Sequence, residues 1–357
     1  MLILSDFHFD VHPEFALPWK DGCNTRLRSQ LDLLEKIFEL GWSLDESNFV
    51  FLGDWFHKWS SVSTVVCSMV TRKLYELLSR DEHTRLYMLP GNHDVPDKRN
   101  WGIHTLASYD GHPKIRVIDQ PRIIELDGVT GIFVPYHQDP TLLLAEAETL
   151  RKESKESDTW LFSHLDMVGA KTGLSDRSWI SPSGLSVDDL SAFAGGFFGH
   201  YHIPQTLVDS AAQEFRYVGA PLHLSTLDAD TGERGVLHVG ENAGGDGIEF
   251  IPLDSPRFIK FDSENPPANL RQQDYHLILA NAEQASSVEA QYRNDGLMCR
   301  ILYKDKKKGE APIQMEQPDS MANALESYVA MRQQGNRKLV NAELMLSYGQ
   351  YYLESEE

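Results

Sequence analysis

Polar side chains that can bind divalent metals recur in five short clusters within the first 202 residues of this 357-residue chain. Each cluster follows an apolar run such as Leu2-Ile3-Leu4 or Phe49-Val50-Phe51-Leu52. Such runs are typical of strands buried on both faces, and open α/β sheets bind ligands beyond the carboxyl ends of these strands. The clusters are Asp6-Phe7-His8, Gly53-Asp54, Gly91-Asn92-His93-Asp94, His164 and Gly199-His200-Tyr201-His202. Together they predict a site for two metal ions.

The donors are carboxylates, imidazoles and one carboxamide, without a thiolate. Such donors suit Mn²⁺, Fe²⁺ or Zn²⁺ in an open catalytic site, and Mg²⁺ is a further candidate. Asp54 ends a central strand and is expected to bridge the ions. Asp6, His8 and one histidine of the Gly-His-x-His pair would complete one ion; Asn92, His164 and the other histidine would complete the second. Two ions about 3.5–4 Å apart can supply a nucleophile and stabilise the attacking and leaving oxygens of a displacement at phosphorus.

His93 has no place as a ligand, because its neighbour Asn92 takes it. It is the candidate for the group that faces the phosphoryl or the leaving oxygen, as a general acid or a cationic stabiliser. Asp94 could orient His93 or cap the following turn. Histidines without motif context are interpreted as surface or core residues, and they are His12, His83, His104, His112, His223, His238 and His276. His137 also follows an expected strand, but its context supports no ligand role.

Composition limits the class of protein. A hydrophobic content of 41% supports a sizeable core, and the three cysteines predict neither a disulfide framework nor a cysteine zinc site. No apolar run is as long as a membrane span, and residues 1–4 already form the first expected strand, so neither a membrane segment nor a leader is expected. These features predict a cytoplasmic protein. The net charge of −20 argues against unaided nucleic-acid binding, so a DNA substrate would require a partner to hold its phosphates.

The pattern of the first 250 residues predicts an α/β fold, with two sheets face to face and helices outside. Helices are expected at 24–40, 60–78 and 140–155, and strands at 115–118, 122–126 and 130–134. A long loop rich in Gly, Ser and Asp spans 166–184, and hairpin strands are expected at 215–218 and 235–239.

Three parts are expected: a catalytic domain at 1–254, a small α/β capping module at 255–317 and a helical hairpin at 318–357. The module has expected strands at 275–279 and 298–303 around a helix at 282–292. The basic run at 304–308 is interpreted as a solvated turn, with a DNA contact as the alternative. The amphipathic helices at 321–333 and 339–353 could pack on the chain's own body or bind a partner's coiled coil.

The five clusters resemble the D-x-H, G-D, G-N-H-D/E, H and G-H-x-H pattern of the calcineurin-like metallophosphoesterases. The resemblance implies the α/β two-sheet sandwich of that family. It also implies that Asp6, His8, Asp54 and His202 hold one metal. Asp54, Asn92, His164 and His200 would hold the other, with His93 as the catalytic histidine.

A narrower resemblance is to the SbcD-type nucleases, the exonuclease partners of SMC-like ATPases in double-strand-break repair. It is carried by Gly53-Asp54-Trp55-Phe56-His57, by His202-Ile203-Pro204-Gln205 and by Tyr217-Val218-Gly219-Ala220-Pro221, in which Ala220 replaces the usual Ser or Thr. The short chain and brief tail look more like the bacteriophage recombination-nuclease branch than like the long eukaryotic members of the family. The resemblance implies that His57 aids exonucleolytic cleavage without holding metal.

This resemblance predicts an Mn²⁺-dependent DNA exonuclease and endonuclease that acts on DNA ends and single-strand/duplex junctions. The expected partner is an SMC-like ABC-type ATPase, with a homodimer of this chain inside a heterotetramer. Two alternatives remain: a small-molecule or cyclic-nucleotide phosphodiesterase, which the acidity favours, and an interaction scaffold. The complete ligand set argues against a scaffold.

Overall fold

The computed structural model describes residues 1–19, 22–154, 156, 158–172, 180–229, 231–240 and 247–304. Within this part of the chain, Met1–Tyr303 form one compact unit. The expected tail helices at 321–333 and 339–353 lie outside the described residues, as do most of the basic run and the end of the expected capping module. No described helix combines the length and the apolar character that crossing a membrane requires.

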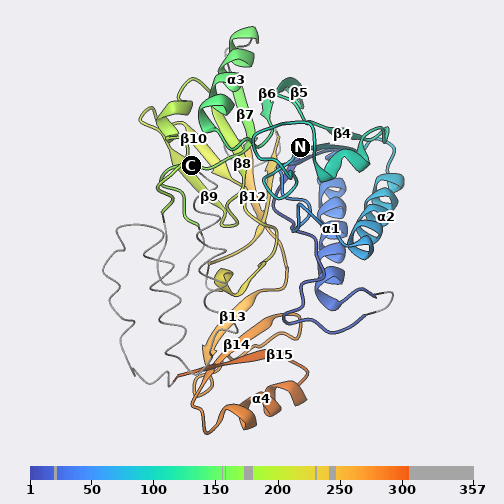
Figure 1. Ribbon diagram of the computed structural model, residues 1–357, viewed down its shortest axis with the longest axis vertical. Helices are drawn as coiled ribbons and strands as arrows, with labels where there is room; N and C mark the ends of the chain where they lie inside the picture. The colour runs from blue at the N-terminus through green and yellow to red at the C-terminus, as the bar shows by residue number, and fades with distance from the viewer. Residues whose placement is uncertain are drawn as a thin grey trace, which may run out of the picture. The chain divides into compact units, whose positions relative to one another are not determined.

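Two six-stranded mixed sheets form the centre of the unit (Figure 1). The first has the order β12 (Ile248–Pro252), β11 (Gly235–Val239), β1 (Leu2–Leu4), β2 (Asn48–Phe51), β3 (Arg85–Met88), β4 (Ile115–Val117). The second has the order β5 (Arg122–Leu126), β6 (Val129–Val134), β7 (Thr159–His164), β8 (Gly195–Gly199), β10 (Glu214–Tyr217), β9 (Gln205–Val208). Strands β1 to β4 are parallel, and so are β6, β7, β8 and β10. The carboxyl ends of β1, β2, β3, β7 and β8 lead into the five clusters.

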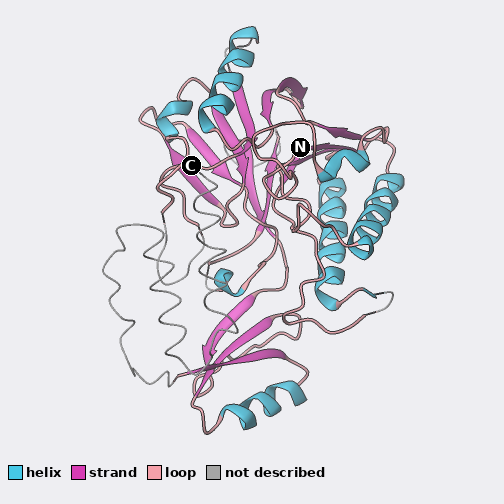
Figure 2. Ribbon diagram, viewed as in Figure 1, coloured by secondary structure: helices cyan, strands magenta, loops and turns pink. Residues whose placement is uncertain are grey.

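Alternation along the strands creates the layers, because successive side chains of a strand point to opposite faces. Ile3 and Val50 point inward and pack with Phe133 and Phe162 of the second sheet. The outer face of the first sheet packs on α1 (Thr25–Ser43) and α2 (Thr64–Arg80). The outer face of the second sheet packs on α3 (Pro140–Glu153). The predicted fold class, two sheets flanked by helices, is confirmed (Figure 2).

The predicted helices form with small shifts at their ends. Asn24 caps α1 by accepting the N–H of Leu27 at 2.9 Å, and the helix continues to Ser43, three residues past the prediction. Helix α2 starts at Thr64 rather than at residue 60, because Ser63 has an extended backbone. Short 3₁₀ helices are η2 (Thr105–Tyr109), η3 (Val187–Leu190) and η4 (Thr226–Asp228).

The two strands predicted as hairpin strands near residues 215 and 235 belong to different sheets. Strand β10 pairs with β9 and β8 in the second sheet, whereas β11 pairs with β1 and β12 in the first. Each forms a hairpin, with β9 and with β12 respectively, and these two strands were not among those predicted. The chain therefore crosses between the sheets after β10.

A third, three-stranded parallel sheet follows the sandwich. It has the order β13 (Phe258–Asp262), β14 (Tyr275–Ala280), β15 (Met298–Tyr303), with α4 (Ala285–Asn294) between the last two strands. Arg26 of α1 connects this sheet to the sandwich. Its guanidinium lies 5.5 Å from the ring centre of Phe258 and 5.0 Å from that of Tyr275, and it donates to the Leu224 carbonyl at 2.7 Å.

Candidate metal centre

The ligand-bearing turns have an unusual backbone. Asp6, His8, Asp54 and His200 all have positive φ angles, of 54°, 48°, 62° and 103°. A residue with a Cβ rarely adopts this conformation, and strain of this kind persists where the surrounding structure holds it in place, often at functional sites. The turns bring these side chains together at the carboxyl ends of β1, β2 and β8.

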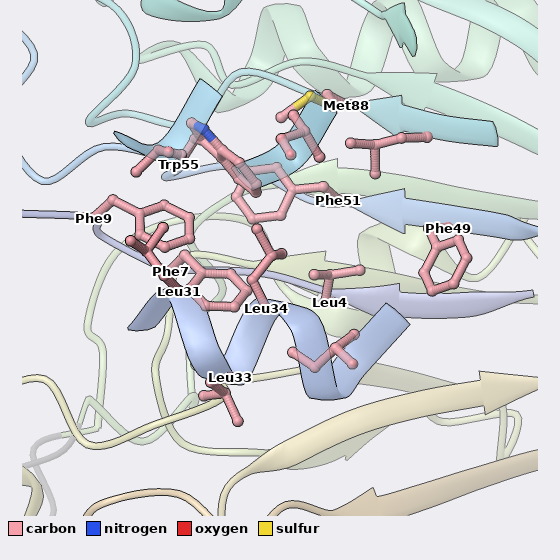
Figure 3. Close-up of a cluster of buried hydrophobic side chains, with 14 of the residues drawn as sticks. Leu4, Phe7, Phe9, Leu31, Leu33, Leu34, Phe49, Phe51, Trp55 and Met88 are labelled. Carbon is pink, nitrogen blue, oxygen red and sulfur yellow. The ribbon is translucent and has the colours of Figure 1, made fainter. Parts of the chain in front are cut away.

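Apolar residues between the ligands hold the turns to the core (Figure 3). Phe7 and Phe9 alternate with Asp6 and His8 and stack on each other, with ring centres 4.5 Å apart. Trp55, next to Asp54, meets Phe9 edge-on at 4.8 Å and is fully buried. Phe7, Phe9 and Trp55 thus anchor the turns that carry Asp6, His8 and Asp54 to the apolar core.

One group of donors is centred on His8. The His8 Nε2 atom lies 3.2 Å from His202 Nε2, 3.4 Å from Asp54 Oδ2 and 3.9 Å from Asp6 Oδ1. The backbone N–H of His200 donates to both Asp6 carboxylate oxygens at 3.2 Å, which orients that carboxylate. Among the described contacts, the buried Nδ1 of His8 has no hydrogen-bond partner.

A second group shares Asp54 with the first. His164 Nε2 lies 3.5 Å from Asp54 Oδ2 and 2.9 Å from Asn92 Oδ1. His200 Nδ1 lies 2.9 Å from the same Asn92 oxygen. The Nδ1–H of His164 donates to the Leu52 carbonyl at 2.7 Å, so its neutral ring presents a lone pair at Nε2. Two acceptors, His164 Nε2 and Asn92 Oδ1, therefore face each other, and a cation bound by both would satisfy them.

The electrostatics of the site also suit a bound cation. Burial, together with the charge of Asp54, raises the pKa of Asp6 far above its ordinary value of 3.8. Burial lowers the pKa of His164 to about 4, and burial also lowers the pKa of His8 and of His202. The imidazoles are thus held in the neutral form that binds metal, and they cannot neutralise the buried carboxylates. The donor set fits divalent cations.

His200 differs from the other histidines of the site. Burial alone would lower its pKa, but the hydrogen bond and the charge of Asp166 outweigh burial and raise the pKa of His200. Without metal, a proton on His200 would donate to Asn92, and a cation would replace that proton.

His93 is oriented through the backbone of His57. The Nδ1–H of His93 donates to the His57 carbonyl at 2.7 Å, which leaves Nε2 as the free nitrogen. The backbone N–H of His93 donates to Asp54 Oδ1 at 2.7 Å. The His57 ring lies parallel to that of His93 within 23°, with ring centres 5.7 Å apart.

The fully buried Asp94 has contacts that differ from the orienting role suggested for it. Its carboxylate accepts the backbone N–H groups of Asp54 at 2.8 Å and Gly91 at 2.9 Å, and the hydroxyl of Thr105 at 3.1 Å. No described hydrogen bond joins it to the ring of His93. The described bonds also do not cap the turn that follows Asp94. The carboxylate instead fixes the turns after β2 and β3, because a carboxylate can only accept and backbone N–H groups of these turns surround it.

Sequence reasoning missed three residues of the site. Gln30 of α1 donates to the carbonyls of Phe7 at 2.8 Å and His8 at 3.1 Å, and a glutamine inside the apolar stripe of a predicted helix was the available signal. Asp166 contacts His200 Nε2 at 2.8 Å. His12, interpreted as a surface or core residue, lies beside the site, with its ring centre 4.9 Å from that of His57. His137 contacts the backbone of Arg99 and Asp139.

Known proteins give a family for this arrangement. No curated protein matches the chain. A dimetal phosphatase from Danio rerio is a similar solved structure, with 11% identity, a TM-score of 0.40, and coverage of 67% of this chain and 92% of that one. The sequence pattern of the family described as Calcineurin-like phosphoesterase matches residues 1–204, more than half of the 357 residues, and includes all five clusters. Members of this family generally use two divalent metal ions. The chain therefore belongs to the calcineurin-like phosphoesterases and is a metal-dependent phosphoester hydrolase.

Proposed function

We propose that this hydrolase is an Mn²⁺-dependent DNA nuclease subunit of the SbcD type, which cleaves phosphodiester bonds at DNA ends and at single-strand/duplex junctions. Two divalent ions, when bound, would supply the nucleophile and stabilise charge on the oxygens at phosphorus. Asp6, His8, Asp54 and His202 would hold one ion, and Asp54, Asn92, His164 and His200 the other.

The position of Asp54 carries the two-ion proposal. Its Oδ2 lies 3.4 Å from His8 Nε2 and 3.5 Å from His164 Nε2, so one oxygen serves both donor groups. Its other oxygen accepts the backbone N–H of His93 at 2.7 Å, which places that residue beside the shared ligand. A carboxylate with a purely structural role would not need to contact both the donor group around His8 and the donor group around His164.

His93 is the proposed catalytic residue. Because its Nδ1–H is bound to the His57 carbonyl, Nε2 is the atom that can donate a hydrogen bond or a proton to a phosphoryl or leaving oxygen. The His57 carbonyl fixes the ring, so the imidazole needs no reorganisation when substrate binds.

A pocket of about 530 Å³ extends from the donors toward the third sheet and supports a substrate larger than phosphate. His8, His57, His93 and His202 line one part of it, and Arg26, Ser225 and Phe258 line another.

The two sequence segments that resemble the SbcD-type nucleases also pack together beside the donors. Gly219 has a φ of 79°, and a Cβ there would lie 2.7 Å from Pro204, so only glycine fits. Ala220 donates its N–H to the His202 carbonyl at 3.1 Å. These contacts give the two segments a common role in holding the loop that carries His202, and they support the narrower resemblance.

The rest of the proposal concerns organisation. Residues 1–254 would form the nuclease domain, 255–317 a capping module and 318–357 a helical hairpin that binds an SMC-like ATPase in the cytoplasm. A homodimer of the chain would act inside a heterotetramer, and the ATPase would hold DNA phosphates that a chain of net charge −20 repels. Deleting 318–357 should leave metal-dependent cleavage intact and abolish binding to the ATPase. Loss of folding in the truncated chain would contradict this assignment.

Hydrolysis of a small phosphodiester, including a cyclic nucleotide, is the alternative function. The net charge of −20 favours it, because a small substrate needs no extended contact with a polyanion.

The test compares substrates on one preparation of the full chain. End-labelled duplex DNA, single-stranded circular DNA, cyclic nucleotides and bis(p-nitrophenyl) phosphate are assayed with Mn²⁺ and with chelator. We expect cleavage of both DNA substrates with Mn²⁺, and activity reduced to background in Asp54→Ala, which should bind neither ion. Asp188→Asn is the control, because the Asp188 carboxylate accepts hydrogen bonds from Ser210 and none of the described bonds joins it to the site. Hydrolysis of cyclic nucleotides without DNA cleavage would select the alternative. Activity that survives in Asp54→Ala would overturn the two-ion site.

A further inference from the structure

Asp166 lies outside the five clusters but contacts one of the proposed ligands. It follows β7 by two residues, and its Oδ1 lies 2.8 Å from His200 Nε2. The hydroxyl of Tyr201 donates to the same oxygen at 2.7 Å. Asp166 Oδ1 is thus in contact with two neighbouring side chains, those of His200 and Tyr201.

This contact determines which nitrogen of His200 can bind a cation. A carboxylate only accepts hydrogen bonds, so the neutral ring of His200 carries its hydrogen on Nε2 and leaves a lone pair on Nδ1. Nδ1 lies 2.9 Å from Asn92 Oδ1, the oxygen that His164 Nε2 also approaches at 2.9 Å. The lone pair of His200 is therefore aimed at the same point as the donors of the second group.

The backbone at Asp166 is held in place. Its carbonyl accepts the N–H of Leu185 at 3.1 Å, and a Cβ at Gly184 would lie 2.2 Å from that carbonyl oxygen. Tyr217 donates its hydroxyl to the carbonyl of Leu165 at 2.8 Å. The carboxylate of Asp166 is thus presented to His200 by a segment packed on both sides.

The two histidines of the second group, His164 and His200, are each oriented by a hydrogen bond at the ring nitrogen that faces away from Asn92. His164 uses the Leu52 carbonyl, and His200 uses Asp166. In the first group, His8 has no described hydrogen-bond partner at Nδ1, the nitrogen that faces away from the other donors. Removal of one orienting group should therefore act on one ion and spare the other.

We propose that Asp166 is a positioning residue that fixes the tautomer and direction of His200 and so sets the affinity of the second ion. The inference rests on the proposed two-ion site. Loss of such an orienting carboxylate weakens metal binding by roughly 10–100-fold in comparable sites.

Calorimetric titration with Mn²⁺ and the electron paramagnetic resonance spectrum of the bound Mn²⁺ test the proposal on the full chain. Wild type should bind two ions and give the spectrum of a coupled pair. In Asp166→Ala one ion should bind as in wild type and the other roughly 10–100-fold more weakly. At one equivalent its spectrum should match that of His164→Ala, which lacks a ligand of the second ion only.

Two milder variants guard against misfolding. Asp166→Asn keeps an acceptor oxygen and should retain more second-ion affinity than Asp166→Ala. Tyr201→Phe removes one hydrogen bond to Asp166 and should weaken the second ion by roughly 2- to 10-fold. Asp188→Asn is the control for removal of an acidic charge away from the site and should bind both ions as wild type does.

The outcomes separate this inference from the proposed function. Two ions bound with wild-type affinity in Asp166→Ala and Tyr201→Phe would overturn the role of Asp166 alone. Equal weakening of both ions, or a lower melting temperature of metal-free Tyr201→Phe, would assign these residues a general structural role and also overturn it. Fewer than two ions in wild type would overturn the two-ion site itself.

Discussion

At the scale of single residues, the backbone of His57 and its side chain have separate roles. The carbonyl orients His93 at 2.7 Å, and any residue at this position would provide that carbonyl. The imidazole lines the pocket beside His93. Burial, followed by the charge of His93, lowers the pKa of His57. A neutral ring beside the substrate pocket is suited to a contact with substrate.

This separation predicts the behaviour of His57→Ala. The variant should bind two ions and keep some single-strand endonuclease activity, because the His93 orientation and the proposed ligands remain. The rate of duplex-end processing should fall by at least roughly tenfold. This loss is smaller than the roughly 10²–10⁴-fold loss expected when a general acid is removed. Parallel assays on the two DNA substrates, with metal content measured on the same sample, decide the matter. The exposed His83 provides the control variant His83→Ala. Equal loss on both substrates would show that the ring supports the whole site.

Asp94 is expected to be important for stability. Burial, followed by the charge of Asp54, raises its pKa, yet its carboxylate satisfies buried N–H groups of two turns. Asp94→Ala leaves these donors unpaired and should lower the free energy of unfolding by about 3 kcal/mol. Urea unfolding measures the change. Asp97→Ala, which removes an exposed carboxylate bonded to Asn100, should change stability little. Wild-type stability with lost catalysis would instead favour the orienting role for Asp94.

At the scale of elements, the site forms where the two sheets approach each other. Gly199 ends β8, and a Cβ there would lie 2.2 Å from the Leu52 carbonyl oxygen, 2.2 Å from Ser5 Oγ and 2.7 Å from His164 Nδ1. The first two atoms belong to segments that leave the first sheet. This close approach lets the Leu52 carbonyl, at the end of β2, orient a histidine of β7.

Gly199→Ala should therefore damage the site and the sandwich together. The added methyl group would separate the sheets or displace His164, at a cost of about 1–3 kcal/mol, and weaken the second ion more than the first. Urea unfolding and Mn²⁺ titration measure these effects. Gly128→Ala is the control, because a Cβ there meets no atom within 4 Å and only the φ of 78° is strained. Unchanged metal binding in Gly199→Ala would show that the sheets can separate without moving His164.

At the scale of the whole molecule, stability depends on pH and metal through the buried site. The folded-state pKa of Asp6 is raised above 3.8, so its contribution to stability is present below pH 3.8 and is lost as the pH rises through the folded value. The folded-state pKa of His164 is lowered from 6.5 to about 4, so its contribution is present above pH 6.5 and is lost as the pH falls toward 4. A bound metal ion would oppose the loss of stability at high pH, because it would neutralise the charge of ionised Asp6. At low pH, protons would compete with metal ions for the imidazole nitrogens.

Mn²⁺ should accordingly stabilise the protein more at pH 8 than at pH 5.5. With Mn²⁺ at 100 times its dissociation constant, the gain is about 3 kcal/mol for each ion, or roughly 5–10 °C in melting temperature at pH 8. Scanning calorimetry with Mn²⁺ and with chelator at both pH values measures it. Asp54→Ala should show no Mn²⁺ effect at either pH. A larger shift at pH 5.5 than at pH 8 would contradict this account of the charges.

The sequence by itself determined the elements and the chemistry of the ligand-bearing turns, because both are local. Apolar runs and their alternation predicted most strands of the two sheets and the three long helices, with shifts of a few residues at the ends. The types of Asp6, Asp54, Asn92 and their partners at strand ends predicted a set of metal donors that the structure brings together.

Only the tertiary structure decided how distant segments meet. The His164 bond to the Leu52 carbonyl spans 112 residues, and that of Gln30 to Phe7 spans 23. The tertiary structure also showed that Asp166 contacts His200, that Asp94 binds the backbone of two turns, and that β10 and β11 belong to different sheets. These contacts depend on packing between elements, and the residues involved are ordinary in their local context. Periodicity and spacing carry information about neighbours along the chain, whereas hydrogen bonds across the sandwich depend on which elements come into contact.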